Sequence, residues 1–341
     1  MICKLCKTQE ANKKNTHYLT DSIIRGALNF DGSNEREKGF YFDMSNNTPF
    51  IEYNFQRNTP VDKVEERLGR NITDEEIEKA KTIPSSVDNV FCSSCEKHFT
   101  GIEEDFITKI LPKFREANLT DFNEIVLEEV KTIRLFFYLQ VWRTAVCCDS
   151  FKITKTCKEN LRNIILNYKS LNIDDINHYP LSITYLQTLG RKEAYTGNSV
   201  GNTNDSNPNL IMMNDFIIQF YEKHIDDITF FDFCNLNNRE TYKKYINYKE
   251  NKFIFNIFQN EKRLQFWENL HLKYKGIPLI SEMKKVFISL YVEIHKKMPS
   301  RELLNEFIKE ITSTKDFNAL QYSKETIIKK TQEFFTRIEN K

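Results

Sequence analysis

Two pairs of cysteines, each with two residues between its members, constrain this chain more than any other feature. Cys3 and Cys6 stand near its start, and Cys92 and Cys95 follow after a gap of 85 residues. A C-x-x-C turn lets two thiolates bind one zinc ion, and two such turns complete a tetrahedral four-cysteine site. A single pair is also found as a redox motif, but two pairs favour the metal. We therefore predict that these distant segments meet around one structural Zn²⁺.

The rest of the chain is consistent with reduced cysteines. No apolar leader follows Met1, and the longest apolar cluster, residues 135–139, is far shorter than the roughly 18 residues that span a bilayer. We expect a cytoplasmic protein with no membrane partner, in which thiols remain free. The remaining four cysteines are expected to be small buried apolar side chains: Cys147, Cys148, Cys157 and Cys234.

The surroundings of the cysteine pairs predict a zinc-finger topology. Apolar residues follow Cys95 at helical spacing, so the second pair should begin a helix, whereas the first pair stands in a polar turn. This is the layout of a treble-clef zinc finger, which we expect over residues 1–110 with an insertion at 29–88. In the insertion, the aromatic segments 39–42 and 50–55 are predicted to pair as short strands. Thr73 and Glu76 have the spacing of a capping box at a helix start.

Beyond the zinc module, the pattern predicts a mainly α chain with a small β component, an α+β fold. Residues 111–180 are expected to form a helical core. Its main helix would run for about 25 residues from Phe122 to Ala145, buried nearly all round, and a shorter helix would lie near 155–169.

The last two predicted domains differ in periodicity. Residues 181–235 are expected to form a small antiparallel sheet, with a strand at 181–186, two strands around a turn at 209–220 and a polar loop at 196–208. Residues 236–341 are expected to be helical. Their interleaved aromatic and basic residues, densest at 242–249, can stack bases and bind phosphates, but they also fit an amphipathic helix with outward-facing lysines.

Four segments together resemble bacterial HNH-endonuclease-like proteins over about residues 1–165. They are CKLC at 3–6, THYLTDSIIR at 16–25, FCSSCEKHFTGIEEDF at 91–106 and FFYLQVWRTAVCCDSF at 136–151. The resemblance implies that His17 is a general base that activates water. It also implies a catalytic Mg²⁺ or Mn²⁺ between hairpin and helix, next to Glu96 and His98, that stabilises the scissile phosphate.

The chain departs from the family pattern at four positions. The family's structural Asn lies five residues before the second cysteine pair, whereas Asn89 lies three residues before it. Thr16 replaces a metal-binding Asp, Glu96 replaces a metal-binding His, and Thr20 replaces a Pro. The carboxylate of Glu96 can still bind a hard cation, helped by His98 or Glu103 one or two helical turns further on. The alternatives are that His17 is hydrogen-bonded inside a small zinc core and that His98 is a solvated helix residue.

Two classes of function follow from these observations. The first is a metal-dependent HNH-like nuclease, by analogy a bacterial anti-phage defence effector; the second is a non-catalytic zinc scaffold that binds nucleic acid or protein. The net charge of +1 demands no polyanion partner. If nucleic acid binds, we assign the contacts to Arg25 and Arg143, because a guanidinium suits a phosphate. An arginine in a central helix, such as Arg143, often pairs with a carboxylate instead. A protein partner or a second copy of the chain is the other class of partner.

Overall fold

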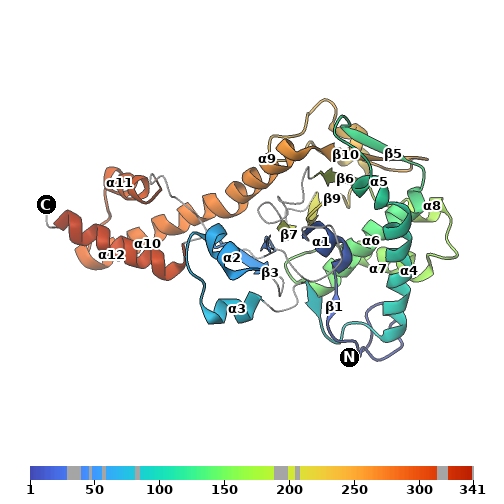
Figure 1. The fold of residues 1–341 in the computed structure, drawn as a ribbon, viewed down its shortest axis with the longest axis horizontal. Coiled ribbons are helices and arrows are strands. Elements are labelled where there is room, and N and C mark those ends of the chain that lie inside the picture. The colour runs from blue at the N-terminus through green and yellow to red at the C-terminus, as the bar shows by residue number, and fades with distance from the viewer. Residues whose placement is uncertain are drawn as a thin grey trace.

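The computed structural model describes residues 1–28, 40–45, 48–55, 59–80, 85–187, 199–203, 208–312 and 322–339. It has an α+β fold with two visibly different parts (Figure 1). The body contains a large sheet with helices against it, and the arm, residues 277–339, extends away from the body on one long helix (Figure 1). Among the described residues, no helix is long and apolar enough to cross a membrane.

The central sheet is larger than the sequence predicts. Its eight strands lie in the order β3-β2-β7-β8-β9-β6-β10-β5. Their bounds are β2 Phe40–Asp43, β3 Glu52–Phe55, β5 Glu124–Leu127, β6 Leu181–Leu186, β7 Ser199–Thr203, β8 Asn209–Met213, β9 Phe216–Phe220 and β10 Phe253–Phe258. The sheet is mixed, because β2 pairs with β7 and β10 pairs with β6 in parallel. The prediction of a small antiparallel sheet confined to residues 181–235 is therefore wrong.

Two further predictions are wrong for identifiable reasons. The helix expected from Phe122 begins only at Val130, as α6 (Val130–Cys147), because residues 124–127 form an edge strand against β10. Phe122 and Val126 are 53% and 47% exposed, so this segment does not belong to the buried helix. The polar loop expected at 196–208 contains β7, whose polar side chains are buried; its remaining residues, except Pro208, lie outside the described residues.

Several local predictions are confirmed. The strands β2 and β3 of the insertion pair antiparallel, with Phe40 opposite Phe55. The capping box forms as predicted: the Thr73 amide donates to the Glu76 carboxylate at 3.0 Å, and the Glu76 amide donates to Thr73 Oγ1 at 3.2 Å. It begins α3 (Asp74–Ala80), which follows α2 (Val61–Leu68). Likewise, β8 and β9 form the expected hairpin.

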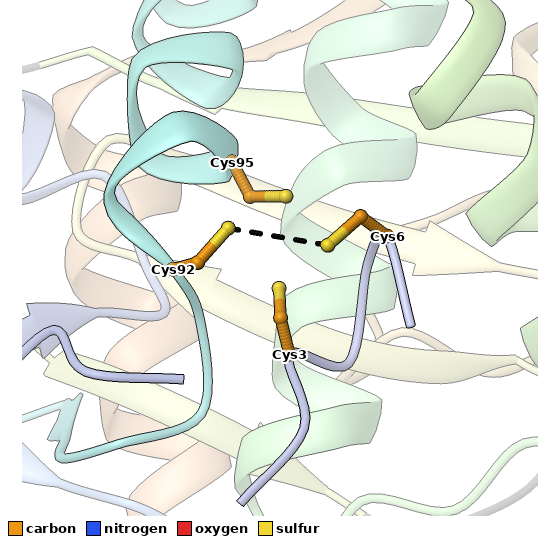
Figure 2. A group of neighbouring side chains, drawn as sticks. All are labelled: Cys3, Cys6, Cys92 and Cys95. Carbon is orange, nitrogen blue, oxygen red and sulfur yellow. Dashed lines mark hydrogen bonds between the residues drawn. The ribbon is translucent and has the colours of Figure 1, made fainter. Parts of the chain in front are cut away.

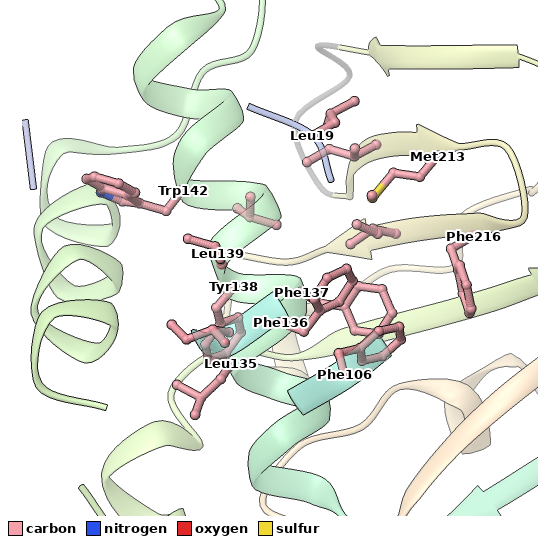
Figure 3. Packing of buried hydrophobic residues seen from close by; sticks show 14 of the residues in the cluster. Leu19, Phe106, Leu135, Phe136, Phe137, Tyr138, Leu139, Trp142, Met213 and Phe216 are labelled. Carbon is pink, nitrogen blue, oxygen red and sulfur yellow. The ribbon is translucent and has the colours of Figure 1, made fainter. Parts of the chain in front are cut away.

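One face of the sheet packs against the helices that follow the second cysteine pair. The helix α4 (Ser93–Lys109) contacts α6, and α6 contacts α7 (Lys155–Asn167) and the short α8 (Ile173–Ile176). Phe106 of α4 stacks on Phe136 of α6 with ring centroids 3.9 Å apart, and Phe216 of β9 meets Phe106 edge-on (Figure 3). The short α5 (Pro112–Arg115) adds Phe114 to this core. As predicted, α6 is buried nearly all round.

The C-terminal part of the chain covers the other face of the sheet and forms the arm. Phe266 and Trp267 of α9 (Asn260–His271) pack on this face. A π-helical turn, Leu272–Gly276, joins α9 to α10 (Ile277–His295), and α11 (Arg301–Thr312) and α12 (Lys324–Glu339) pack on α10 (Figure 1). The prediction that residues 236–341 are helical is thus met within the described residues by α9 to α12, but β10 precedes these helices.

Candidate metal centre

The first cysteine pair is held in place by backbone hydrogen bonds. The Lys7 amide donates to the Cys3 carbonyl at 3.0 Å, which closes the turn between the two thiols. The Lys4 amide donates to the Val90 carbonyl at 3.1 Å, and this contact joins the turn to the segment that precedes the second pair. Two short strands, β1 (Thr16–His17) and β4 (Ser86–Val87), pair antiparallel between the two cysteine pairs.

The second pair stands at the N-terminus of α4. Cys92 is the N-cap residue in extended conformation, and the Glu96 amide donates to its carbonyl at 3.1 Å. Cys95 lies in the first turn of the helix and is buried. Phe91, just before the pair, packs edge-on against Phe99 of the same helix, which fixes the direction of entry into α4.

The four sulfur atoms point toward one another, as the sequence predicts (Figure 2). All four Sγ atoms lie within 4.8 Å of one another, and Cys6 and Cys92 are 4.0 Å apart. Zinc bound tetrahedrally at about 2.3 Å from each sulfur needs sulfur separations of about 3.8 Å. The geometry and the all-thiolate donor set therefore fit one Zn²⁺. When bound, the ion would supply a structural cross-link between the two segments.

Burial raises the pKa of Cys92 and Cys95, which favours their thiol forms in the absence of metal. At Cys6 burial acts in the same direction, but hydrogen bonds from Thr8 and Gln9 outweigh it and lower the pKa to about 6. Metal ligands must be thiolates, so zinc binding here is coupled to proton release.

His17 lies on β1 and belongs to a small ion-paired group. Its Nδ1 is 3.8 Å from Oδ1 of Asp21, and Oδ2 of Asp21 is 2.5 Å from Nε of Arg25. Asp21 begins α1 (Asp21–Leu28), so the three residues follow one another at intervals of four. Their side chains are 21–23% exposed. His17 and Arg25 were predicted as site residues from the sequence, but Asp21 was not. Its position four residues from each of them is the signal that identifies it.

The residues predicted to bind a catalytic cation do not come together. His98 lies against α7, where its Nε2 is 2.7 Å from the carbonyl of Ile165 and its ring packs edge-on against Tyr168. Glu96 is largely buried, Oε1 of its carboxylate has no hydrogen-bond partner, and burial raises its pKa. In the described parts of the chain, only the four cysteines form a group that could share one ion. The expected Mg²⁺ or Mn²⁺ has no preformed set of three or more such ligands there.

Arg143 belongs to a buried polar network. Its guanidinium pairs with Glu103 at 2.5 Å, and Thr20 donates to the same carboxylate at 2.7 Å. The Gln140 side chain donates to Thr20 Oγ1 at 2.8 Å and accepts from the Thr20 amide at 3.0 Å. Arg143 is 2% exposed, so it pairs with a carboxylate, which is the alternative that the sequence left open, and is poorly placed to contact nucleic acid. This network fixes the start of α1 against α4 and α6, and thereby positions Asp21.

No family model matches the chain, and neither a curated protein nor a solved structure matches it. Any functional assignment therefore depends on the residues themselves.

Proposed function

We propose that the protein is a zinc-stabilised nuclease of the HNH type that hydrolyses nucleic-acid phosphodiesters with His17 as general base. The observation that carries this proposal is the position of His17. It lies on a short antiparallel pair of strands, β1 and β4, which come between the two cysteine pairs in the chain, and a carboxylate faces one nitrogen of its ring. A treble clef with its catalytic histidine on the first hairpin strand would have this arrangement.

Each residue of the group has a chemical role in this proposal. The imidazole of histidine titrates near neutral pH and can take a proton from the attacking water. A carboxylate at Nδ1, here that of Asp21, holds the ring orientation and favours the protonated form that develops during reaction. The guanidinium of Arg25 is suited to a phosphate oxygen, because it presents a planar fork of donors. The thiolate-bound zinc would hold the hairpin against α4.

The test compares His17→Ala with a matched histidine variant. The purified protein is incubated with supercoiled plasmid, single-stranded DNA and single-stranded RNA, each with Mg²⁺ or Mn²⁺. We expect cleavage of at least one substrate, slowed about 100-fold or more in His17→Ala, the usual scale for loss of a general base. His224→Ala is the control, because His224 also faces an aspartate, Asp226 at 3.2 Å, far along the chain from the zinc module. Cleavage that persists in His17→Ala would remove His17 from the mechanism.

The second candidate is a non-catalytic zinc scaffold that binds nucleic acid or another protein, including a second copy of this chain. It is favoured by the contact of His98 with the Ile165 carbonyl and by Thr16 at the position of the family's metal-binding Asp. Binding of labelled DNA or RNA without cleavage under every metal condition would support it. The anti-phage role is a further part of the nuclease proposal, and it predicts protection of a phage-challenged host that His17→Ala abolishes.

A further inference from the structure

A patch of buried polar side chains lies on the sheet face opposite the helical core. Alternate residues of β6, β9 and β10, such as Ile183, Ile218 and Phe255, pack into that core. The residues between them face the other way, and four of these are polar: Ser182, Thr184, Gln219 and Asn256. Ser182 is directly opposite Gln219, and Thr184 is directly opposite Asn256, so the patch is continuous across three neighbouring strands.

Packing alone does not explain this patch. The same face carries apolar residues on either side of it, Leu186 and Phe258 under α9 and Tyr221 near Ile246. Ser182, Thr184 and Gln219 are only 5%, 1% and 6% exposed, and polar groups are costly to bury unless they are hydrogen-bonded. Asn256 Nδ2 donates to Thr184 Oγ1 at 3.3 Å and Gln219 Nε2 donates to the Tyr221 hydroxyl at 3.4 Å, and each amide keeps further donor and acceptor capacity for a ligand. Such placement is common where a few polar groups orient a ligand inside a largely apolar pocket.

The polar patch forms the floor of a cavity of about 290 Å³. Four aromatic residues also line it, Phe231, Phe233, Tyr242 and Tyr245, all from the segment that joins β9 to β10. Lys244 and Lys262 are the charged residues of its lining. The Lys244 ammonium is 2.7 Å from the Glu124 carboxylate, and the Lys262 ammonium lies 5.8 Å from the centroid of the Phe258 ring.

We propose that this cavity is a binding site for a mononucleotide. Amide and hydroxyl groups on the floor can donate to and accept from the edge of a heterocyclic base. The aromatic walls offer surfaces for base stacking, and lysines at the rim suit a phosphate. The volume is at the small end of ligand pockets, which favours one nucleotide over an oligonucleotide. The floor belongs to the sheet face that points away from α4 and α6, so this site is separate from the cysteine centre and from His17.

The experiment uses the full chain loaded with zinc and isothermal titration calorimetry. The probes are AMP, GMP, CMP and UMP, their four nucleosides, inorganic phosphate, and glucose as an uncharged ring with hydroxyl groups. Three variants are compared: Lys262→Ala at the rim, Gln219→Met on the floor, and Lys249→Ala as the control. Lys249 is an exposed lysine beside Tyr248 that is not part of the lining.

We expect saturable binding of at least one monophosphate. Lys262→Ala should weaken it about tenfold, as loss of a charge-assisted contact does, without changing the affinity of the nucleoside. Gln219→Met should weaken nucleotide and nucleoside alike, and Lys249→Ala should change neither. Lys262 is on the helix surface, so its variant reports on binding even if Gln219→Met lowers stability.

The proposal is overturned if no monophosphate binds, if glucose binds while nucleotides do not, if phosphate alone binds as tightly as the nucleotide, or if Lys262→Ala binds like the wild type. None of these readouts involves cleavage, so the result is independent of whether the protein is a nuclease.

Discussion

The N-terminal zinc module and the C-terminal arm differ in what orders them. Residues 1–28 contain one two-residue strand and one helix of eight residues, and their turn brings Cys3 and Cys6 to two thiols from α4. The arm has no cysteine, and its described residues form three helices around an aromatic cluster. In that cluster the ring of Phe287 lies 4.5 Å from Phe307 and 5.0 Å from Phe335.

This difference shows which interaction stabilises each region. Segments too short to bury much apolar surface need a cross-link, and a metal ion such as zinc bound by the four thiols would supply one that depends on metal and pH. Three amphipathic helices bury enough surface by themselves, so their stability depends on side-chain volume. The two regions should therefore respond to different perturbations.

The largest effect is expected from loss of a zinc ligand. Cys95→Ser should abolish stoichiometric zinc binding and leave the segment 1–28 unprotected, because structural zinc contributes about 10–16 kcal/mol in small zinc peptides. Metal analysis and hydrogen exchange measure this, and exchange in the arm should stay unchanged. Cys157→Ser, a buried cysteine outside the group, is the control and should retain zinc. Full zinc content in Cys95→Ser would refute the four-thiolate site.

A substitution that leaves a cavity in the arm should have the opposite effect, with faster hydrogen exchange in the arm and unchanged zinc content. Phe287→Ala is expected to destabilise the arm by about 4 kcal/mol, the usual cost of removing a buried aromatic ring. Exchange should rise in α10–α12 while zinc content stays at that of the wild type. Phe122→Ala, at a 53% exposed position, is the matched control with a small effect. Zinc loss in Phe287→Ala would show that the two regions are not independent.

The smallest effect is expected in the insertion, where a surface ion pair contributes to the free energy of unfolding. The Arg70 side chain donates two hydrogen bonds to Glu76 and holds the pKa of this carboxyl at about 2, below its ordinary 4.5. The pair's contribution is therefore complete above pH 4.5 and is lost as the pH falls toward 2. Because both side chains are about a third exposed, it should amount to less than about 1 kcal/mol.

Urea unfolding at pH 6 and pH 3 measures this contribution. Glu76→Gln should be less stable than the wild type at pH 6, and the difference should shrink at pH 3. Glu75→Gln, an exposed neighbour on the same helix, is the control. A difference that grows on acidification would contradict the assignment.

Local features of the fold could be read from the sequence, but the strand order could not. The alternation in β6 and the hairpin of β8 and β9 are visible in the residues, as is the capping box at Thr73. The parallel pairing of β10 with β6 joins segments about 70 residues apart, and no local pattern reports it. The strand β7 was missed because its Ser199, Asn202 and Thr203 are buried although they are polar. Burial of such residues depends on neighbours that periodicity does not show.

The same limit applies to the sites. The meeting of the cysteine pairs was predictable, since zinc chemistry fixes both residue type and spacing. The pairing of Arg143 with Glu103 required knowing that α4 packs on α6, and the sequence left that choice open. The floor of the cavity combines residues from three strands, so it became visible only with the register of the sheet.

The π-helical turn at Leu272–Gly276 determines the side of the long helix on which the rest of the arm packs. Such a turn holds one residue more than an α-helical turn, and each helical residue rotates everything after it by about 100°. The orientation of the arm also depends on contacts with the body. The buried Lys275 ammonium donates to the Thr48 carbonyl at 3.0 Å, and Phe50 packs with the arm's aromatic cluster. Removing a single residue from the turn would swing α11 and α12 toward another side of the long helix and separate them from Phe50.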